Sequence, residues 1–177
     1  MDWFSKRPHD RINAPRAGAR PSVSRVSACL LIGEFPRPED IPWLQSEFGV
    51  TAVHNLQDDE DFALNGLRER ELREACSASG IKFVRTQIPD GSADAMAERL
   101  GETLEALARL IRGGDCVYLH CNAGLNRAPT LAIAYLRAHD GMSLDEACAH
   151  VKQQRACGPF MTVLEDYFGP RHHKPAR

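Results

Sequence analysis

Residues 115–136 read DCVYLHCNAGLNRAPTLAIAYL, and this stretch changes character twice along its length. Residues 115–120 form a short apolar run that is typical of a buried strand. Residues 127–136 have the apolar content of a helix, and Pro129 fits its first turn, where a missing N–H is harmless. The stretch therefore predicts a strand, a six-residue loop over 121–126 and a helix.

The loop between these two elements has the features of a phosphate-binding site. Gly124 stands in its middle. A strand-to-helix loop of this kind can curl until successive backbone N–H groups converge on an anion at the N-terminus of the helix. We expect six residues to bind phosphate: Asn122, Ala123, Gly124, Leu125, Asn126 and Arg127.

Three side chains around the loop suggest a chemical reaction. Cys121 opens the loop, so the same N–H groups would stabilise its thiolate, a nucleophile that can attack phosphorus in line. Arg127 follows six residues later and can hold two phosphate oxygens with its planar guanidinium. His120 faces away from Cys121 along the strand, and we expect it to brace the loop by hydrogen bonding. The alternative is a buried cysteine in an ordinary strand–helix turn.

Cleavage of a phosphomonoester also needs a group that protonates the leaving oxygen and later activates water. Asp90 is the predicted general acid, because it follows the expected strand over 81–88 at the sheet edge where ligands of open α/β sheets bind. Asp94 is an alternative acid, and a structural role for Asp90 is another possibility. The acidic run over 58–61 is expected to be either a solvated loop or a wall of the substrate entrance.

The rest of the chain alternates short apolar runs with segments of helical period. The chain of 177 residues has the length of one domain. The alternation predicts a single-domain α/β fold with a mostly parallel central sheet flanked by helices. The expected strands cover 28–33, 51–56, 81–88 and 116–120, and the expected helices cover 39–48, 67–78, 93–112, 127–139 and 144–155.

Composition limits the classes of function and the location. The net charge of −2 argues against a nucleic-acid binder, and no apolar run approaches the roughly 18 residues of a membrane span. The N-terminus lacks the apolar core of a secretory signal, and the six cysteines form no C-x-x-C pair. We therefore expect a cytoplasmic protein with free thiols and without a metal site. The sequence indicates no oligomeric state.

The predicted domain organisation has three parts. Residues 1–25 are rich in Arg, Pro and Gly and predict a basic, flexible arm; residues 26–168 form the catalytic domain, and residues 169–177 a basic tail. The arm could instead contact an anionic partner, or it could target an organelle, which Asp2 and Asp10 disfavour.

His120, Cys121 and Arg127 match the pattern His-Cys-x5-Arg, and the chain over about 26–168 resembles the dual-specificity branch of the protein-tyrosine phosphatase superfamily. The spacing of Asp90 and Cys121 is also similar to that of this branch. The resemblance implies a protein-tyrosine phosphatase-like fold and cofactor-free, two-step hydrolysis through a cysteinyl phosphate. It implies a phosphorylated protein (on Tyr, Ser or Thr) or a similar phosphomonoester as substrate.

Four segments, over 31–41, 56–61, 121–129 and 155–159, are more specifically similar to plant starch (glucan) phosphatases and, less closely, to laforin. This resemblance implies a phosphoglucan substrate. The chain carries Leu64, Asn65 and Gly91 where the plant enzymes have aromatic residues that stack on sugars. Ala128 follows the arginine where most members of the branch have Ser or Thr, which predicts slower hydrolysis of the intermediate. Two competing interpretations of the motif are a non-catalytic phosphate-binding module and a sulfur-transferring enzyme.

Overall fold

The computed structural model describes residues 19–174, which form an α/β domain around a five-stranded sheet. The strand order is β1-β2-β5-β3-β4. The sheet is mostly parallel, because only β1 runs antiparallel to its neighbour β2. The predicted fold class is therefore confirmed. The strands are β1 (Val23–Ser27), β2 (Leu30–Gly33), β3 (Ala52–Asn55), β4 (Lys82–Arg85) and β5 (Val117–His120).

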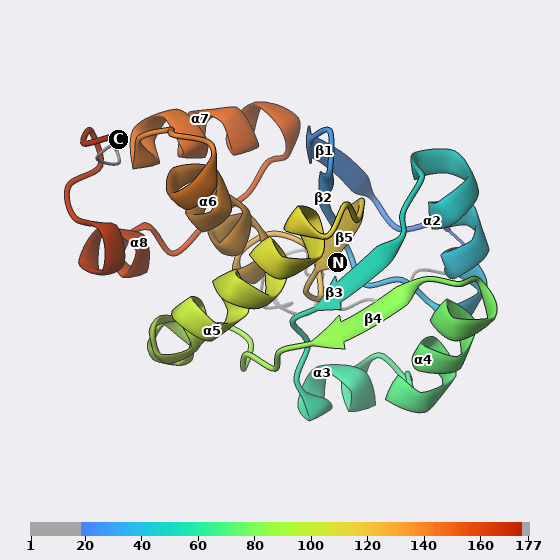
Figure 1. Cartoon of the computed structure of the whole chain (residues 1–177). Coiled ribbons are helices and arrows are strands. Elements are labelled where there is room, and N and C mark those ends of the chain that lie inside the picture. The colour runs from blue at the N-terminus through green and yellow to red at the C-terminus, as the bar shows by residue number, and fades with distance from the viewer. Residues whose placement is uncertain (1–18, 175–177) are drawn as a thin grey trace, which may run out of the picture.

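Helices cover both faces of the sheet, as Figure 1 shows. One face carries α5 (Ala93–Arg112), α6 (Arg127–His139), α7 (Leu144–Gln154) and α8 (Met161–Phe168). The other face carries the 3₁₀ turn η1 (Pro38–Asp40) with α2 (Ile41–Phe48), α3 (Asp59–Leu64) and α4 (Glu69–Ala78).

The two apolar layers follow from the alternation of side chains along the central strands. Val117 and Leu119 of β5 pack in the layer of α5–α8, whereas Tyr118 between them packs in the layer of α2–α4. All three are fully buried. Successive strand residues point to opposite faces, so a strand covered on both sides must be apolar at nearly every position. The unbroken apolar run that predicted this strand has that physical cause.

The element boundaries show where the sequence pattern was informative. Helices α5 and α6 begin and end at the expected residues, and the expected helix over 39–48 is divided into η1 and α2. Three elements were not predicted. Strand β1 has polar residues at three of its five positions, α3 begins within the acidic run and has only six residues, and α8 has only eight. Each lacks the long apolar period on which sequence interpretation depends.

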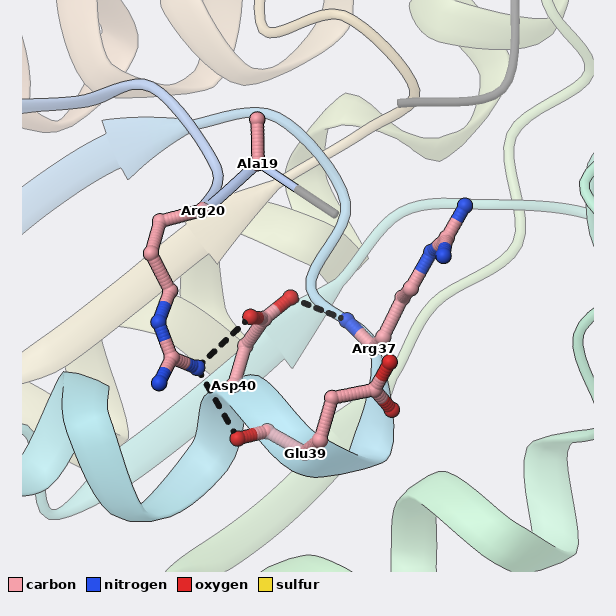
Figure 2. Close-up of a pocket in the computed structure, with 5 residues that line it drawn as sticks. All are labelled: Ala19, Arg20, Arg37, Glu39 and Asp40. Carbon is pink, nitrogen blue, oxygen red and sulfur yellow. Dashed lines mark hydrogen bonds and ion pairs between the residues drawn. The ribbon is translucent and has the colours of Figure 1, made fainter. Parts of the chain in front are cut away.

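The start of the described chain is attached to the domain ahead of its first strand. Arg20 donates hydrogen bonds to the carboxylate of Asp40 and to the carbonyl of Glu39, both at 3.0 Å (Figure 2). Strand β1 begins at Val23, so the last three residues of the expected arm belong to the sheet. Residues 1–18 of that arm and 175–177 of the expected tail lie outside the described residues.

The topology brings several chain segments to one edge of the sheet. The parallel strands β2, β5, β3 and β4 all end there, and the antiparallel strand β1 begins there. Loops that follow parallel strands meet at this edge in open α/β sheets. No helix between residues 19 and 174 is both long and apolar enough to cross a membrane.

Candidate active site

The loop over 121–126 lies at this edge between β5, which ends at His120, and α6, which begins at Arg127. His120 stands beside Gly33 of β2 and Asn55 of β3 in the register of the sheet. The loop is therefore in the middle of the sheet and is flanked by the segments that follow β2 and β3. Cys121 is almost completely buried, and Arg127 is fully buried.

Every backbone carbonyl of the six-residue loop accepts a hydrogen bond. The donors of the first five come from outside the loop, and the last carbonyl is bound within the first turn of α6. In loop order the pairs are Cys121 O with His120 Nδ1 (3.1 Å), Asn122 O with Phe35 N (2.9 Å), Ala123 O with Arg155 Nη2 (2.8 Å), Gly124 O with Arg155 Nε (2.7 Å), Leu125 O with Gly158 N (2.8 Å) and Asn126 O with Thr130 N (2.9 Å).

These hydrogen bonds determine where the N–H groups of the loop point. A peptide unit is planar and trans, so each C=O lies opposite the N–H of the next residue. Carbonyls that are held on the outside of the loop therefore turn the following N–H groups to its inside. Gly124 has φ of 65°, and a Cβ at this position would lie 2.5 Å from the carbonyl oxygen of Gly33. Only glycine fits there.

Arg127 is held from two sides behind the loop. Its Nη1 lies 2.6 Å from Oδ2 of Asp61 and donates to the carbonyl of Ile88 at 2.7 Å. Its Nη2 lies 2.8 Å from Oδ1 of Asp90, and its Nε has no hydrogen-bond partner among the described residues. Burial opposes the charge, but the negative charges of Cys121, Asp61 and Asp90 raise the pKa of Arg127 above its ordinary value. The site thus contains a permanently charged donor.

Asp61 is a site residue that the sequence pattern did not single out. The acidic run is not a solvated loop here, because it forms α3, in which Asp58 caps the N-terminus and accepts from Asp61 N at 2.8 Å. This cap directs Asp61 inward, where it is 2% exposed. Burial raises the pKa of Asp61, and the contacts with Arg127 counter part of that effect. The three-residue spacing of Asp58 and Asp61, which is that of a capping box, was the signal that could have found it.

A chain of buried amides connects the loop to the end of β3. The side-chain amide of Asn122 donates from Nδ2 to Oδ1 of Asp61. Its side-chain oxygen, Oδ1, accepts from Gln57 Nε2 at 2.7 Å and from Asn65 Nδ2 at 2.9 Å. Gln57 is in turn held by Asn55. We expected Asn122 to bind phosphate through its backbone, and its side chain is committed to this network.

The predicted acid lies at the mouth of the site. Asp90 lines a cavity of about 180 Å³ together with Asp58, Glu60 and Leu64. Its side chain is 41% exposed while it contacts Arg127, so it is accessible to solvent and to a bound ester. The alternative acid, Asp94, is exposed in the first turn of α5 and does not line this cavity.

Two further residues of the motif have defined partners. The ring of His120 is fully buried, and its Nδ1 contacts the first loop carbonyl, that of Cys121, at 3.1 Å. Thr130 cannot replace the hydroxyl that Ala128 lacks, because its Oγ1 donates to Asn126 O at 2.7 Å and accepts from Phe160 N at 2.9 Å.

Two of the other thiols, Cys76 and Cys157, lie in surroundings that disfavour the thiolate. All six cysteines are free, and burial raises the pKa of Cys76 to about 12 and also raises the pKa of Cys157. Neither thiol is therefore ionised near neutral pH. Within residues 19–174, no group of three or more His, Cys, Asp or Glu side chains is arranged to hold a metal ion.

Known proteins resemble this chain in sequence and in fold. Phosphoglucan phosphatase DSP4 (amyloplastic) of Castanea sativa is 32% identical over 139 residues, which are 77% of this chain and 37% of that protein. Laforin of Mus musculus is 27% identical over 154 residues, which are 81% of this chain and 46% of that protein. The chain thus spans less than half the length of these relatives.

A solved structure and a family model extend the comparison over the whole domain. The active form of Tk-PTP superposes with a TM-score of 0.69 at 26% identity, covering 82% of this chain and 95% of that one. The model of the dual specificity phosphatase catalytic domain matches residues 34–164, which include the loop, Asp61 and Asp90. This chain belongs to the dual specificity phosphatase family.

Proposed function

We propose that this protein hydrolyses phosphomonoesters in two steps, with Cys121 as nucleophile, Arg127 as the phosphate-binding cation and Asp90 as general acid and base. The observation that carries the proposal is the loop with Cys121 at its start, in which all six carbonyls accept hydrogen bonds and the first five do so from donors outside the loop. The inward N–H groups can bind the three equatorial oxygens of a phosphoryl group.

The first step transfers the phosphoryl group to the protein. The Cys121 thiolate attacks phosphorus in line, a P–S bond forms and the P–O bond to the leaving group breaks. Asp90 gives its proton to the departing oxygen. Arg127, whose charge is secured by its surroundings, binds the oxygens on which negative charge develops.

The second step regenerates the thiolate. A water molecule attacks phosphorus while Asp90 accepts its proton, the P–S bond breaks and inorganic phosphate leaves. Ala128 offers no hydroxyl to the departing sulfur, and the hydroxyl of Thr130 is already bound. We therefore expect this second step to limit turnover for substrates with good leaving groups.

We infer a phosphorylated protein side chain or a similar monoester as substrate. Leu64 is 63% exposed at the rim of the cavity, where it can contact an apolar or aromatic carrier of the phosphate. None of the described residues that line the cavity is aromatic. A cytoplasmic location also stays a prediction, and the relative from Castanea sativa is amyloplastic.

A phosphoglucan is the second candidate substrate. It is favoured by the 32% identity to a phosphoglucan phosphatase over most of this chain. The polar rim, which includes Asp58 and Glu60, could accept hydrogen bonds from sugar hydroxyls.

Three measurements test the proposal. Hydrolysis of an aryl phosphate should be lost in Cys121→Ser, and equal rates in wild type and variant would exclude the cysteine mechanism. Asp90→Asn should slow esters with poor leaving groups far more than those with good ones, since only the former depend on a proton donor. Phosphate release from a panel of phosphopeptides and from phosphorylated amylopectin then distinguishes the two substrate classes.

A further inference from the structure

The middle of the phosphate loop is supported by one side chain that lies outside it. Arg155 follows α7, and its guanidinium donates from Nε to Gly124 O at 2.7 Å and from Nη2 to Ala123 O at 2.8 Å. The remaining nitrogen, Nη1, donates to the hydroxyl of Ser22 at 2.9 Å. No carboxylate of the described chain pairs with Arg155, so its hydrogen bonds all go to neutral oxygens.

These two bonds determine the direction of two N–H groups that face the substrate. The carbonyl of Ala123 shares a peptide plane with the N–H of Gly124, and the carbonyl of Gly124 shares one with the N–H of Leu125. Because the guanidinium is planar, it holds both carbonyls on the outer side at once. It thereby turns both N–H groups toward the inside of the loop.

Among residues 19–174, Arg155 alone performs this role in the middle of the loop. The carbonyls of Asn122 and Leu125 are held by backbone N–H groups, which belong to the surrounding fold. The two carbonyls between them depend on Arg155. They flank Gly124, the loop residue with the greatest conformational freedom, so the peptide planes there can rotate when the guanidinium is removed.

We propose that Arg155 is a positioning residue for the reaction: it sets the N–H groups of Gly124 and Leu125 toward the phosphoryl oxygens without touching the substrate. This inference rests on the proposed function of the loop. It predicts that the fork geometry of Arg155 matters more than its charge, because its partners are carbonyls whose directions must both be fixed.

Two substitutions separate geometry from charge. Arg155→Lys keeps the charge but offers a single nitrogen, which cannot hold both carbonyls in the same way, and Arg155→Met removes the donors altogether. We expect both variants to weaken the binding of tungstate, measured by calorimetry, by about tenfold. We expect kcat/KM for an aryl phosphate to fall by about 10- to 100-fold, which is less than the roughly 100- to 1000-fold loss that follows outright removal of an oxyanion donor, because here the donors are only misplaced.

The dependence of the rate on the leaving group provides a readout that general destabilisation would not give. Asp90 is not in contact with Arg155, so the ratio of rates for good and poor leaving groups should stay that of the wild type. The matched control is Arg70→Met, which removes an exposed arginine on α4 that is remote from the loop. It should keep wild-type tungstate affinity and turnover.

Several outcomes would overturn this inference. Wild-type affinity and turnover in Arg155→Lys would show that charge suffices, and wild-type values in Arg155→Met would show that the loop needs no such support. A lowered melting temperature with unchanged tungstate affinity would reduce Arg155 to a stabilising role. If the proposed catalysis itself fails, with Cys121→Ser equal to wild type, the tungstate titration still reports on Arg155.

Discussion

Arg127 keeps its charge in a place where water cannot solvate it, and two carboxylates make this possible. A buried ion that loses its partner is destabilising by several kcal/mol, so a buried guanidinium requires a counter-charge in a fixed place. Asp61 provides this counter-charge from the protein interior, with its Oδ2 at 2.6 Å from Arg127 Nη1. Asp90 provides it from the mouth of the site, with its Oδ1 at 2.8 Å from Arg127 Nη2. Asp61 is buried and held by its helix cap, whereas Asp90, the acid that we propose, is the more exposed of the two carboxylates.

The Asp61→Asn substitution tests this division of roles. It keeps the shape of the side chain but removes the charge, so Arg127 loses its fixed partner while the bond to Ile88 O stays. Because a small misplacement of a catalytic group has a large effect on rate, we expect kcat for an aryl phosphate to fall by about 10- to 100-fold. The measurement is steady-state kinetics.

The matched control is Asp59→Asn in the same helix. Asp59 is 83% exposed and pairs with Arg85 outside the cavity, so this change of the same chemical kind should leave kcat within about twofold of wild type. Equal losses in the two variants would contradict a specific role for Asp61.

His54 gives the fold a defined dependence on pH. Its ring is fully buried in β3, Nε2 bonds with Oγ1 of Thr86 at 2.8 Å, and burial lowers its pKa from 6.5 to about 3. Below pH 6.5 the unfolded chain binds a proton that the folded protein excludes. The free energy of unfolding should therefore decrease as pH falls from 6.5 toward 3, by about 2 kcal/mol at pH 5.

The His54→Gln substitution isolates this contribution. Glutamine does not titrate and retains a polar group that can reach Thr86. Urea unfolding at a series of pH values between 7 and 4.5 should give a shallower decrease for the variant than for wild type. Parallel curves would show that His54 does not carry the effect.

At the level of elements, α3 connects local sequence to the site. Its N-cap Asp58 accepts from Asp61 N, and Asp61 accepts in return from Asp58 N at 3.2 Å. This reciprocal pair starts the helix and directs the buried carboxylate toward Arg127. The short helix has no long apolar face, so its cap contributes much of its order.

Replacement of the cap should therefore affect both stability and activity. Asp58→Ala is expected to lower the free energy of unfolding by about 1 kcal/mol and to lower kcat, because the backbone N–H of Asp61 loses its capping acceptor. Asp58→Asn retains a capping oxygen and should lose less of both. Chemical denaturation and steady-state kinetics measure the two effects, and equal losses in Ala and Asn variants would argue against the cap.

At the level of the whole molecule, the residues just ahead of β1 attach the N-terminal segment to the active-site edge. Arg20 bonds to Asp40, the backbone N–H of Ser22 bonds to Glu34, and the hydroxyl of Ser22 bonds to Arg155. All three contacts precede β1. We therefore propose that the domain begins before residue 26.

Two truncations locate this boundary. Removal of residues 1–18 deletes none of the described contacts and should leave the free energy of unfolding within about 0.5 kcal/mol of the full chain. Removal of residues 1–25 deletes most of β1 with its contacts and should lower it by at least about 2 kcal/mol, since each lost hydrogen bond removes about 1 kcal/mol. Equal stability of the two fragments would support the boundary after residue 25.

The sequence by itself determined the features that depend on local pattern. Local sequence predicted an apolar strand that ends at His120, a loop that contains Gly124 and a helix that begins at Arg127. These elements in turn predicted the sheet and the position of the loop at its edge. Asp90 could be proposed because it follows a recognisable strand and an edge of the sheet collects such residues. Local sequence was sufficient to predict these features, because each depends on residues that are close together in the chain.

Only the tertiary structure decided which distant residues support that chemistry. Asp61 and Arg155 are 66 and 28 residues from Arg127 in the chain, and one-dimensional pattern does not say which polar side chains will pack against the loop. Their partners are a guanidinium and two carbonyls that meet them only after the sheet has formed. Asp61 is buried and Arg155 is half-buried against the loop, and both placements are properties of the packed molecule.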